Sequence, residues 1–422
     1  MNWCEIATVD RSEFLAQVIC RGRASHSGDF MQAGLIILCL GYVLSQFFRA
    51  FLAVLSSALQ TDLGASPEDL AFASGLWFLT FAVMQLPVGW ALDRIGPSRT
   101  AAALLLFGGG GGALVFALAS QPVHISFAMV LIGVGCSPVL MASYYIFARE
   151  YPPRRFATLA ALMLGVGSLG NLVASYPTAL AVEVLGWRGT LFGLAGISTA
   201  VALGIALTVK DPARVEVSDG PKGSVLDILR MPVLWPIFIM MFVAYAPSAA
   251  LRGLWIGPYM SDVFGLGSEA IGVASLVMGG AMILGTFAYG PMDRLLGTRK
   301  GVVLGGNLLA CAALGGLMLY IDGPVPLVVA LMAAVGFFGA AFPVILAQGR
   351  AFVPPHLVGR GVTMLNFFGI GGVGIMQFAS GRLHAETTGA ELSLPYFVIF
   401  GFLLAFLAAG CAIYLLSRDS LD

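Results

Sequence analysis

The sequence predicts an all-α polytopic membrane protein in which twelve transmembrane helices form two pseudo-symmetric six-helix bundles. Three observations support this prediction: an apolar composition, twelve long apolar stretches, and a loop motif that occurs once in each half. Of the 422 residues, 59% are hydrophobic and 10% are charged, and the mean hydropathy is +0.92. Soluble proteins have about 45–50% apolar and about 25% charged residues. The composition therefore excludes a soluble enzyme, a secreted disulfide scaffold and a disordered chain.

Charge balance and the metal-binding residue types exclude two further classes. Lys+Arg and Asp+Glu both number 22, so no net basic charge attracts the chain to nucleic acid. The six cysteines and four histidines are scattered, without the short spacings of metal sites. We therefore expect no metal, no cofactor and no nucleic-acid partner.

Residues 1–31 mix acidic and basic side chains and lack the apolar core of a secretory signal peptide. We expect them to form a cytoplasmic N-terminal extension. Translation that begins at Met31, directly before the first apolar run, is an alternative that the sequence leaves open.

Twelve mostly apolar stretches lie between polar breaks, and each is close to the roughly 20 residues that a bilayer-spanning helix needs. The longest polar interruption, residues 210–230, comes after the sixth stretch. We therefore predict an N-terminal bundle (32–209), a cytoplasmic linker (210–232), a C-terminal bundle (233–416) and a cytoplasmic tail (417–422). The predicted helices are 32–59, 70–92, 98–119, 124–148, 156–182, 188–209, 233–261, 269–291, 300–320, 325–349, 361–383 and 394–416.

The distribution of Lys and Arg predicts the orientation, because cytoplasmic loops carry an excess of these residues. If both termini are cytoplasmic, 18 of the 22 Lys and Arg residues lie on that side, and only Arg188 and Arg382 lie outside. The other two, Arg49 and Arg252, fall within predicted helices. We expect a multi-pass protein of the plasma membrane, the inner membrane if the source is a bacterium.

A loop motif occurs after the second helix of each predicted half. Both copies place two glycines seven positions apart, an Asp-Arg pair between them, and a basic residue three positions after the second glycine. In the second copy the Asp follows the first glycine by three positions instead of four. The first copy contains Gly89, Asp93, Arg94, Gly96 and Arg99, and the second contains Gly290, Asp293, Arg294, Gly297 and Lys300.

This motif resembles the loop 2–3 signature of the major facilitator superfamily, G-x-L-a-D-r-x-G-r-k, and the twelve-helix layout resembles that family from about residue 32 to 416. The resemblance implies a secondary transporter in which two six-helix bundles rock about a site at the membrane midplane. The fifth helix lacks the G-P-x-x-G-G element of the family's drug/proton antiporters, which disfavours multidrug efflux.

The motif residues are candidates for a cytoplasmic gate. Two partners for Asp93 are open: the N-terminus of the eleventh helix near Gly361, or an arginine across the seam between the halves. Such contacts form only when the cytoplasmic side is closed, and they would therefore bias one conformer. The gating candidates are Gly89, Asp93, Arg94, Gly96, Arg99, Arg149, Glu150, Asp293 and Arg294.

Arg49 and Arg252 are the candidate centre of a substrate site. An ionised side chain within a transmembrane helix costs about 2.5–3.5 kcal/mol even on mild insertion scales, and it normally faces a cavity. The two arginines lie in the first and seventh helices, which correspond in the two halves. The predicted substrate-binding residues are Arg49, Arg252, Tyr42, Gln46, Tyr245, Trp255, Tyr259, Tyr145, Asn171 and Asn366.

No Asp or Glu is predicted at the depth of the two arginines, so the substrate is expected to supply the counter-charge. The guanidinium fork matches carboxylate and phosphate oxygens. The predicted function is therefore uniport or exchange of a small organic anion: a carboxylate, a sugar acid or phosphate, or a peptide carboxylate. We expect a monomer in the lipid bilayer.

Three other functions compete with anion transport. The first is proton-coupled transport of a neutral or amphipathic solute, or drug efflux. The second is a transport-dead receptor or sensor, for which the sequence offers no added signalling domain. The third is an intramembrane enzyme, for which no cluster of catalytic residues lies at membrane depth.

Overall fold

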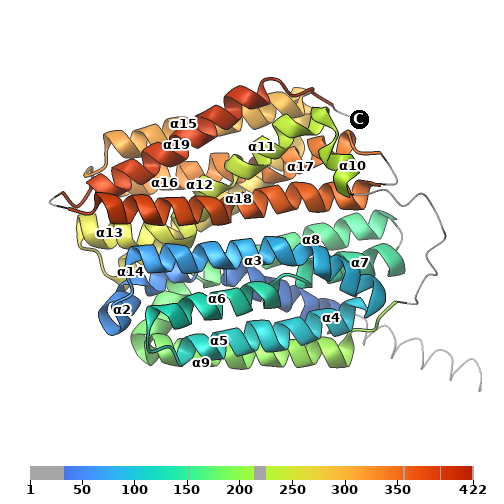
Figure 1. Cartoon of the computed structure of the whole chain (residues 1–422), viewed down its shortest axis with the longest axis horizontal. Coiled ribbons are helices and arrows are strands. Elements are labelled where there is room, and N and C mark those ends of the chain that lie inside the picture. The colour runs from blue at the N-terminus through green and yellow to red at the C-terminus, as the bar shows by residue number, and fades with distance from the viewer. Residues whose placement is uncertain (1–32, 152, 213–224, 355–356, 390, 421–422) are drawn as a thin grey trace, which may run out of the picture.

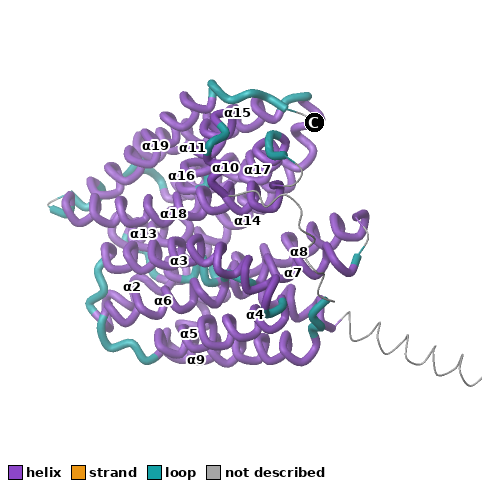
Figure 2. Tube along the Cα trace, turned by 45° about the vertical axis from the view of Figure 1, so that its right-hand side comes forward, coloured by secondary structure: helices purple, strands orange, loops and turns teal. Residues whose placement is uncertain are grey.

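The computed structural model describes residues 33–151, 153–212, 225–354, 357–389 and 391–420, and this part of the chain contains helices and no strand (Figure 2). The predicted extension 1–31 lies outside the described residues, as do residues 213–224 of the predicted linker. The first described helix is Ala33–Phe47. The later elements are α2 (Leu52–Leu63), α3 (Pro67–Arg94), α4 (Pro97–Leu104), the π-helix η1 (Leu105–Gly110), α5 (Gly111–Ala117), α6 (Pro122–Cys136), α7 (Val139–Glu150), α8 (Pro153–Val173), α9 (Tyr176–Thr208), α10 (Val225–Leu229), the 3-10 helix η2 (Pro232–Leu234), α11 (Trp235–Ala244), α12 (Ala246–Ala250), the π-helix η3 (Leu251–Trp255), α13 (Ile256–Phe264), α14 (Ser268–Leu296), α15 (Arg299–Leu319), α16 (Val325–Phe338), the 3-10 helix η4 (Gly339–Ala341), α17 (Phe342–Ala351), α18 (Val358–Thr387) and α19 (Leu394–Tyr414).

These elements make up twelve spans. Among the described residues, ten helical segments are long and apolar enough to cross a membrane, and the first helix with α2, bent by 53°, makes an eleventh. The twelfth is found within α9, where Gly186 has a non-helical backbone with φ 70° and ψ 164°. Gly186 separates the end of the fifth span, which begins with α8, from the sixth span, which runs to Thr208. The prediction of twelve transmembrane helices is thus confirmed.

The two halves lie one above the other in Figure 1, with the blue and green N-terminal helices below the yellow and red C-terminal helices. The helices α3 and α18 run side by side along the seam. Their close approach depends on glycine: a Cβ at Gly75 would lie 2.6 Å from a ring carbon of Phe378, and one at Gly381 would lie 2.7 Å from Ala71. Small residues allow membrane helices to approach in this way.

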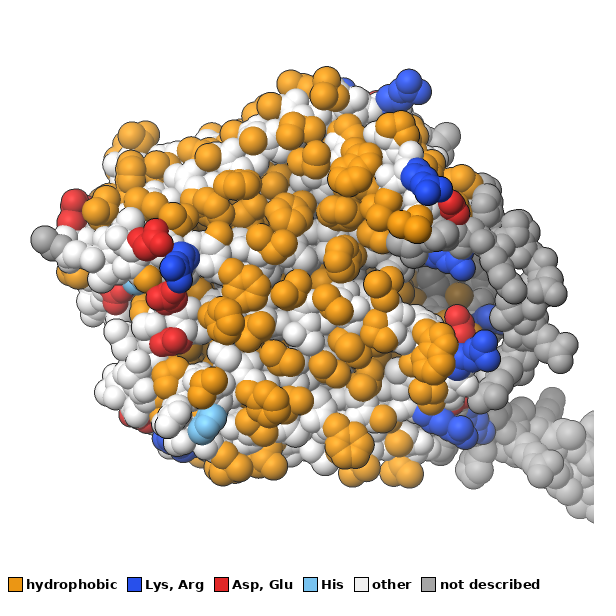
Figure 3. Space-filling model, viewed as in Figure 1, with side chains coloured by type: hydrophobic (Ala, Val, Ile, Leu, Met, Phe, Trp, Pro, Cys, Tyr) orange, Lys and Arg blue, Asp and Glu red, His pale blue; other side chains and the backbone are white. Residues whose placement is uncertain are grey.

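The surface separates apolar flanks from charged ends. In Figure 3, hydrophobic side chains cover the flank of the bundle and the charged side chains gather at its two ends, with most of the visible Lys and Arg at one of them. We call this the basic end; Arg94, Arg149 and Arg294 lie there in exposed positions. A flank of this kind is what a bilayer-embedded bundle requires, because lipid offers no partner to polar groups.

Sequence signals place the ends of several helices. Ser66 and Asp69 form a capping box at the start of α3, with Asp69 N donating to Ser66 Oγ at 3.1 Å. Gly64 and Gly265 end α2 and α13 in the left-handed conformation, with φ near +63° and +64°. These two glycines occupy equivalent positions in the two halves, 201 positions apart.

Glycine packing between the third and fourth spans yields a testable expectation. A Cβ at Gly108 would lie 2.5 Å from the backbone nitrogen of Gly135, and Gly135 in turn meets the backbone of Gly109. We expect Gly135→Val to cost roughly 3 kcal/mol of folding stability through overpacking, lowering Tm by roughly 5 °C or more. Thermal unfolding of the purified protein in detergent measures this. Gly193→Val, at a glycine with open space around it, is the matched control and should leave Tm nearly unchanged.

Candidate functional site

Arg49 lies at a break in the first span. The first helix stops at Phe47, residues 48–51 form turns, and α2 begins at Leu52 with its axis turned by 53°. Within the break, backbone hydrogen bonds join residues three positions apart instead of four, and Ala50 N donates to Phe47 O at 3.0 Å. The break therefore sets Arg49 at a point where the regular helix is interrupted.

Arg252 lies at the corresponding place in the seventh span. That span runs through α11, α12, η3 and α13, and Arg252 belongs to the π-helical segment η3. Single π-helical turns inside α-helices occur frequently at functional sites, and transporters form their sites from interrupted helices. Both arginines thus occupy irregular segments of equivalent spans.

A second internal repeat accompanies the arginines. Tyr42, Ser45 and Arg49 in the first span follow the pattern Tyr-x-x-Ser-x-x-x-Arg. Tyr245, Ser248 and Arg252 in the seventh span follow the same pattern, and each residue is 203 positions from its counterpart. The loop motif alone gave an offset of 201 and left the arginines two positions out of register. Alignment of the two tyrosines would have revealed the repeat from sequence.

The two repeats meet at the seam. The guanidinium carbon of Arg49 lies 5.0 Å from the ring centre of Phe81 and 5.5 Å from that of Trp77. Arg252 is only 1% exposed, and its guanidinium interacts electrostatically with the Tyr245 phenol. Arg49 and Arg252 interact electrostatically, as do Tyr42 and Tyr245. The structure therefore brings together four of the predicted residues, two from each half.

Neither arginine has an acidic partner within the part of the chain that the structure describes. Ion pairs elsewhere in it join Arg99 to Asp211, Arg188 to Asp62, Arg299 to Asp293 and Arg382 to Glu386. Three buried guanidinium nitrogens have no hydrogen-bond partner: Nε of Arg49, and Nε and Nη1 of Arg252. The site thus presents free donors and positive charge in an apolar interior.

Other predicted substrate residues take two different places. Gln46 donates from Nε2 to the Tyr42 hydroxyl at 3.0 Å, and Asn171 lies on α8, whose glycines contact the same helix. Asn366 is half-buried on α18. Trp255 instead donates from Nε1 to Ser380 Oγ at 2.9 Å and stacks on His384, and Tyr259 donates to the backbone oxygen of Ile321 at 2.6 Å. The structure places these two aromatic side chains in packing contacts within the C-terminal half.

At the basic end, Tyr145 joins the gating candidates and lies away from the arginines. It interacts electrostatically with Asp93, it accepts a hydrogen bond from Arg149 Nη2 at 3.5 Å, and the Arg149 guanidinium lies 5.2 Å from the centre of its ring. A Cβ at Gly361, one of the two sites considered for Asp93, would meet Val353. In this conformer Asp93 contacts its own half, so the predicted gate across the seam stays a prediction.

Glu150 lines a cavity of about 310 Å³ at the basic end, between the first helix, the end of α7 and the end of α9. Lys210 and Asp211 contribute to the same wall. Neither Arg49 nor Arg252 lines this cavity.

A partly buried contact that sequence reasoning missed holds the loop motif of the N-terminal half. Ser98 N donates to Asp211 Oδ1 at 2.6 Å at the start of α4, and the Arg99 side chain lies 3.9 Å from Asp211 Oδ2. Gly96 has φ +114°, and a Cβ there would collide with the same carboxylate. Gly96 is therefore required both by the turn and by the approach of Asp211.

Asp419 repeats this arrangement in the C-terminal half. It lies just after the last span and accepts hydrogen bonds from Thr298 and from Lys300 N, the latter at 3.0 Å. Partial burial raises the pKa of Asp419, but the hydrogen bonds outweigh that effect and hold the pKa below its usual value. Within the loop motif, Asp293 pairs with Arg299 at 3.2 Å and Arg294 is exposed. The sequence feature that could have revealed both contacts is an acid shortly after the sixth span, Asp211, and shortly after the twelfth, Asp419.

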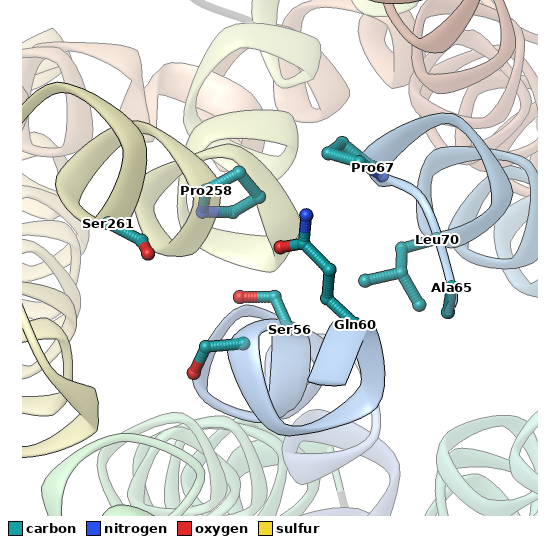
Figure 4. A pocket seen from close by; sticks show the side chains of 8 residues that line it. Ser56, Gln60, Ala65, Pro67, Leu70, Pro258 and Ser261 are labelled. Atoms are coloured by element: carbon teal, nitrogen blue, oxygen red, sulfur yellow. The ribbon is translucent and has the colours of Figure 1, made fainter. Parts of the chain in front are cut away.

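The end opposite the basic end is closed. Four side-chain hydrogen bonds cross the seam there: Ser57 to Ser268, Ser175 to Ser275, Tyr176 to Glu269, and Gln377 to Ser74. The cavity shown in Figure 4 lies between α2, α3 and α13, and side chains such as Gln60 and Pro258 point into it. Its volume of about 10 Å³ is enough for a single water molecule at most. Passage to the arginines from this end is therefore blocked.

Comparison with known proteins places this arrangement in context. Residues 38–285 match the family model described as Major Facilitator Superfamily. The 4-hydroxybenzoate transporter PcaK of Acinetobacter baylyi is 28% identical over 179 residues, which cover 42% of this chain and 38% of the relative. The chain thus aligns with well under half the length of that relative. The probable L-galactonate transporter of Escherichia coli is 20% identical over 408 residues, covering 90% of this chain and 83% of the relative.

A solved structure shares the fold. The crystal structure of a bacterial homolog of the human lysosomal transporter Spinster superposes with a TM-score of 0.74 at 18% identity, covering 92% of this chain and 96% of the other.

The Asp211 contact leads to a prediction about stability. Asp211→Ala removes a charge-assisted hydrogen bond to the backbone at the start of α4, which is worth about 1.5–3 kcal/mol. Arg99→Ala removes only an ion pair whose arginine is 75% exposed, so its cost should stay below about 1 kcal/mol. Chemical denaturation of the two variants in detergent compares these costs. Equal losses in the two variants would show that the ion pair, and not the backbone hydrogen bond, anchors the loop.

Proposed function

The chain belongs to the major facilitator superfamily, and from that premise we propose that it transports a small organic anion bound between Arg49 and Arg252. Membership points to a transporter and not to an enzyme. The observation that carries the proposal is the pair of guanidinium groups, one from each half, that no carboxylate of the described chain neutralises.

The energetics of burial favour a ligand that completes the site. Each unpaired charge inside an apolar bundle costs several kcal/mol, and the two like charges also repel each other. A carboxylate that accepts from the free Nε and Nη1 atoms relieves both costs. The two relatives are named for 4-hydroxybenzoate and L-galactonate, both of which are carboxylates, and this supports an anionic substrate.

Transport follows from the position of the site between the halves. We propose that the halves rock about the arginine pair, so that the closed end opens when the basic end closes. In this proposal the basic end faces the cytoplasm, both termini are cytoplasmic, and the protein is a monomer in the plasma membrane.

A second candidate, proton-coupled transport, is favoured by one cluster in the C-terminal half. Tyr396 donates to Asp262, the ring of His384 lies 5.4 Å from that of Tyr396, and His384 stacks on Trp255 at 5.2 Å. Trp255 follows Arg252 by three positions. The buried imidazole of His384 is a group that is able to take up a proton.

Charge removal at the two arginines tests the proposed site. Arg49→Met and Arg252→Met keep the apolar stem and remove the charge. We expect each to weaken binding of 4-hydroxybenzoate or galactonate at least about thirtyfold, because a buried charged contact is worth about 2 kcal/mol or more. Lys should rescue poorly, since it lacks the guanidinium fork. Isothermal titration with purified protein measures the affinities.

The folding stability of the two Met variants without ligand tests the proposed site independently. Removing an uncompensated buried charge should leave each empty Met variant at least as stable as empty wild-type protein. Arg382→Met, at an exposed arginine paired with Glu386, is the control and should bind normally. Wild-type affinity in both site variants would refute the proposed site.

Transport in liposomes separates the two coupling modes. The arginine pair predicts that uptake is accelerated by a like anion loaded inside and responds weakly to an imposed pH gradient. Proton coupling predicts accumulation driven by the pH gradient alone, lost in Asp262→Asn or His384→Gln. The second result would replace exchange by proton coupling while leaving the arginine site in place.

A further inference from the structure

We propose that Gln46 and Asn171 select anions that carry a hydroxyl group on a flat apolar body, that is, hydroxylated aromatic acids. This inference rests on the proposed function and assigns what lies at the other pole of the ligand. The arginines account for its carboxylate and leave the remainder of the molecule unspecified.

Two carbonyl oxygens near the arginines lack donors. Gln46 uses its amide nitrogen on the Tyr42 hydroxyl at 3.0 Å, and its Oε1 is buried without a partner. Asn171 Oδ1 is likewise buried without a partner. These are acceptors, whereas the free guanidinium nitrogens are donors. The ligand that satisfies both sets has an acceptor at one end and a donor at the other.

The two amides lie at the same level on neighbouring helices. The helix α8 crosses the first helix where a Cβ at Gly170 would meet Val43 O and would lie 3.0 Å from Phe47 N. Asn171 is the next residue along α8, and Gln46 lies between the two contacted positions of the first helix. Gln46 precedes Arg49 by three positions, across the break at residues 48–51. On the other side, Leu172, which follows Asn171, and the Arg252 side chain both lie against Gly279. The two amides therefore belong to the segments that surround the arginines.

The chemistry of the surroundings decides which donor fits. An ammonium group would need a carboxylate beside it, and the electrostatic partners of Tyr42 and Arg252 include tyrosine and arginine but no acid. A neutral hydroxyl needs only a carbonyl oxygen. A buried carbonyl left without a donor costs about 1–3 kcal/mol, so a ligand hydroxyl recovers energy that an unsubstituted acid cannot recover.

The apolar walls favour a ring over a polyol. Phe81 and Trp77 lie against Arg49, and the ring of Phe342 lies 5.6 Å from that of Tyr245. A sugar acid carries several hydroxyls that each need a hydrogen-bond partner, and the aromatic walls add one free donor, Trp77 Nε1. A planar ring with a hydroxyl matches the walls, and its O–H donates to one of the two acceptors.

Paired ligands test this selection. The affinities of benzoate and 4-hydroxybenzoate are measured by isothermal titration with wild-type protein, Gln46→Met and Asn171→Leu. We expect wild-type protein to bind 4-hydroxybenzoate at least about tenfold more tightly than benzoate, as one unsatisfied buried acceptor predicts. At least one of the two variants should reduce that ratio to about threefold or less, chiefly by losing affinity for 4-hydroxybenzoate.

Asn307→Leu is the matched control, since Asn307 Oδ1 on α15 is also buried without a partner. It should leave the ratio unchanged. Equal affinity of wild-type protein for the two acids, or an unchanged ratio in both variants, overturns the selection and leaves the arginine site standing. Tighter binding of galactonate than of either aromatic acid also overturns it. Failure of all three anions to bind wild-type protein overturns the proposed function together with the selection.

Discussion

The constraint on which the rest of the structure depends is the placement of two guanidinium groups, Arg252 buried and Arg49 partly buried, without an acid to neutralise them. One charge of this kind costs about 2.5–3.5 kcal/mol on mild insertion scales, and a second one nearby adds repulsion. The protein reduces the cost locally by placing Arg49 against the faces of Phe81 and Trp77 and Arg252 beside the Tyr245 hydroxyl. It does not remove the cost, because three guanidinium nitrogens keep no partner.

The irregular backbone around the arginines is a consequence of that constraint. A regular helix directs each long side chain along its own surface, whereas the break at residues 48–51 and the π-helical turn η3 alter the direction of Arg49 and Arg252. Gly253 beside Arg252 lets the two interrupted segments approach, since a Cβ there would lie 3.0 Å from Arg49 O. Interrupted helices and small residues thus bring like charges from opposite halves to one place.

Much of this fold was predictable from the sequence, and the exceptions have physical causes. Hydropathy located the spans because the bilayer imposes their length, and the matching depths of Arg49 and Arg252 were evident from the repeat. The faces were harder to assign. Tyr245, Arg252, Trp255 and Tyr259 share a face of a regular helix, but the π-helical turn at residues 251–255 adds a residue to the turn and rotates the later part of the span.

That rotation explains why Trp255 contacts Ser380 and Tyr259 contacts Ile321, while Tyr245 remains with the arginine. The contacts of Asp211 and Asp419 were missed for another reason. Each joins positions more than a hundred residues apart, and the sequence signal, an acid after the sixth and after the twelfth span, is recognisable only when the two halves are compared.

The charges of the two arginines also determine how substrate binding would affect the change between conformations in a carrier of this kind. Rocking requires a state in which both ends are closed, and closure removes water from the charges between the halves. With the site empty, two positive charges lose their solvation, and the cost of the occluded state rises. With a carboxylate bound between them, part of that charge is neutralised before closure. In the proposed anion carrier, the loaded protein would therefore reach the occluded state more readily than the empty one, and exchange of one anion for another would be favoured over net flux. Such coupling needs no protonated group, because the charge of Arg49 and Arg252 itself penalises the return of the empty carrier.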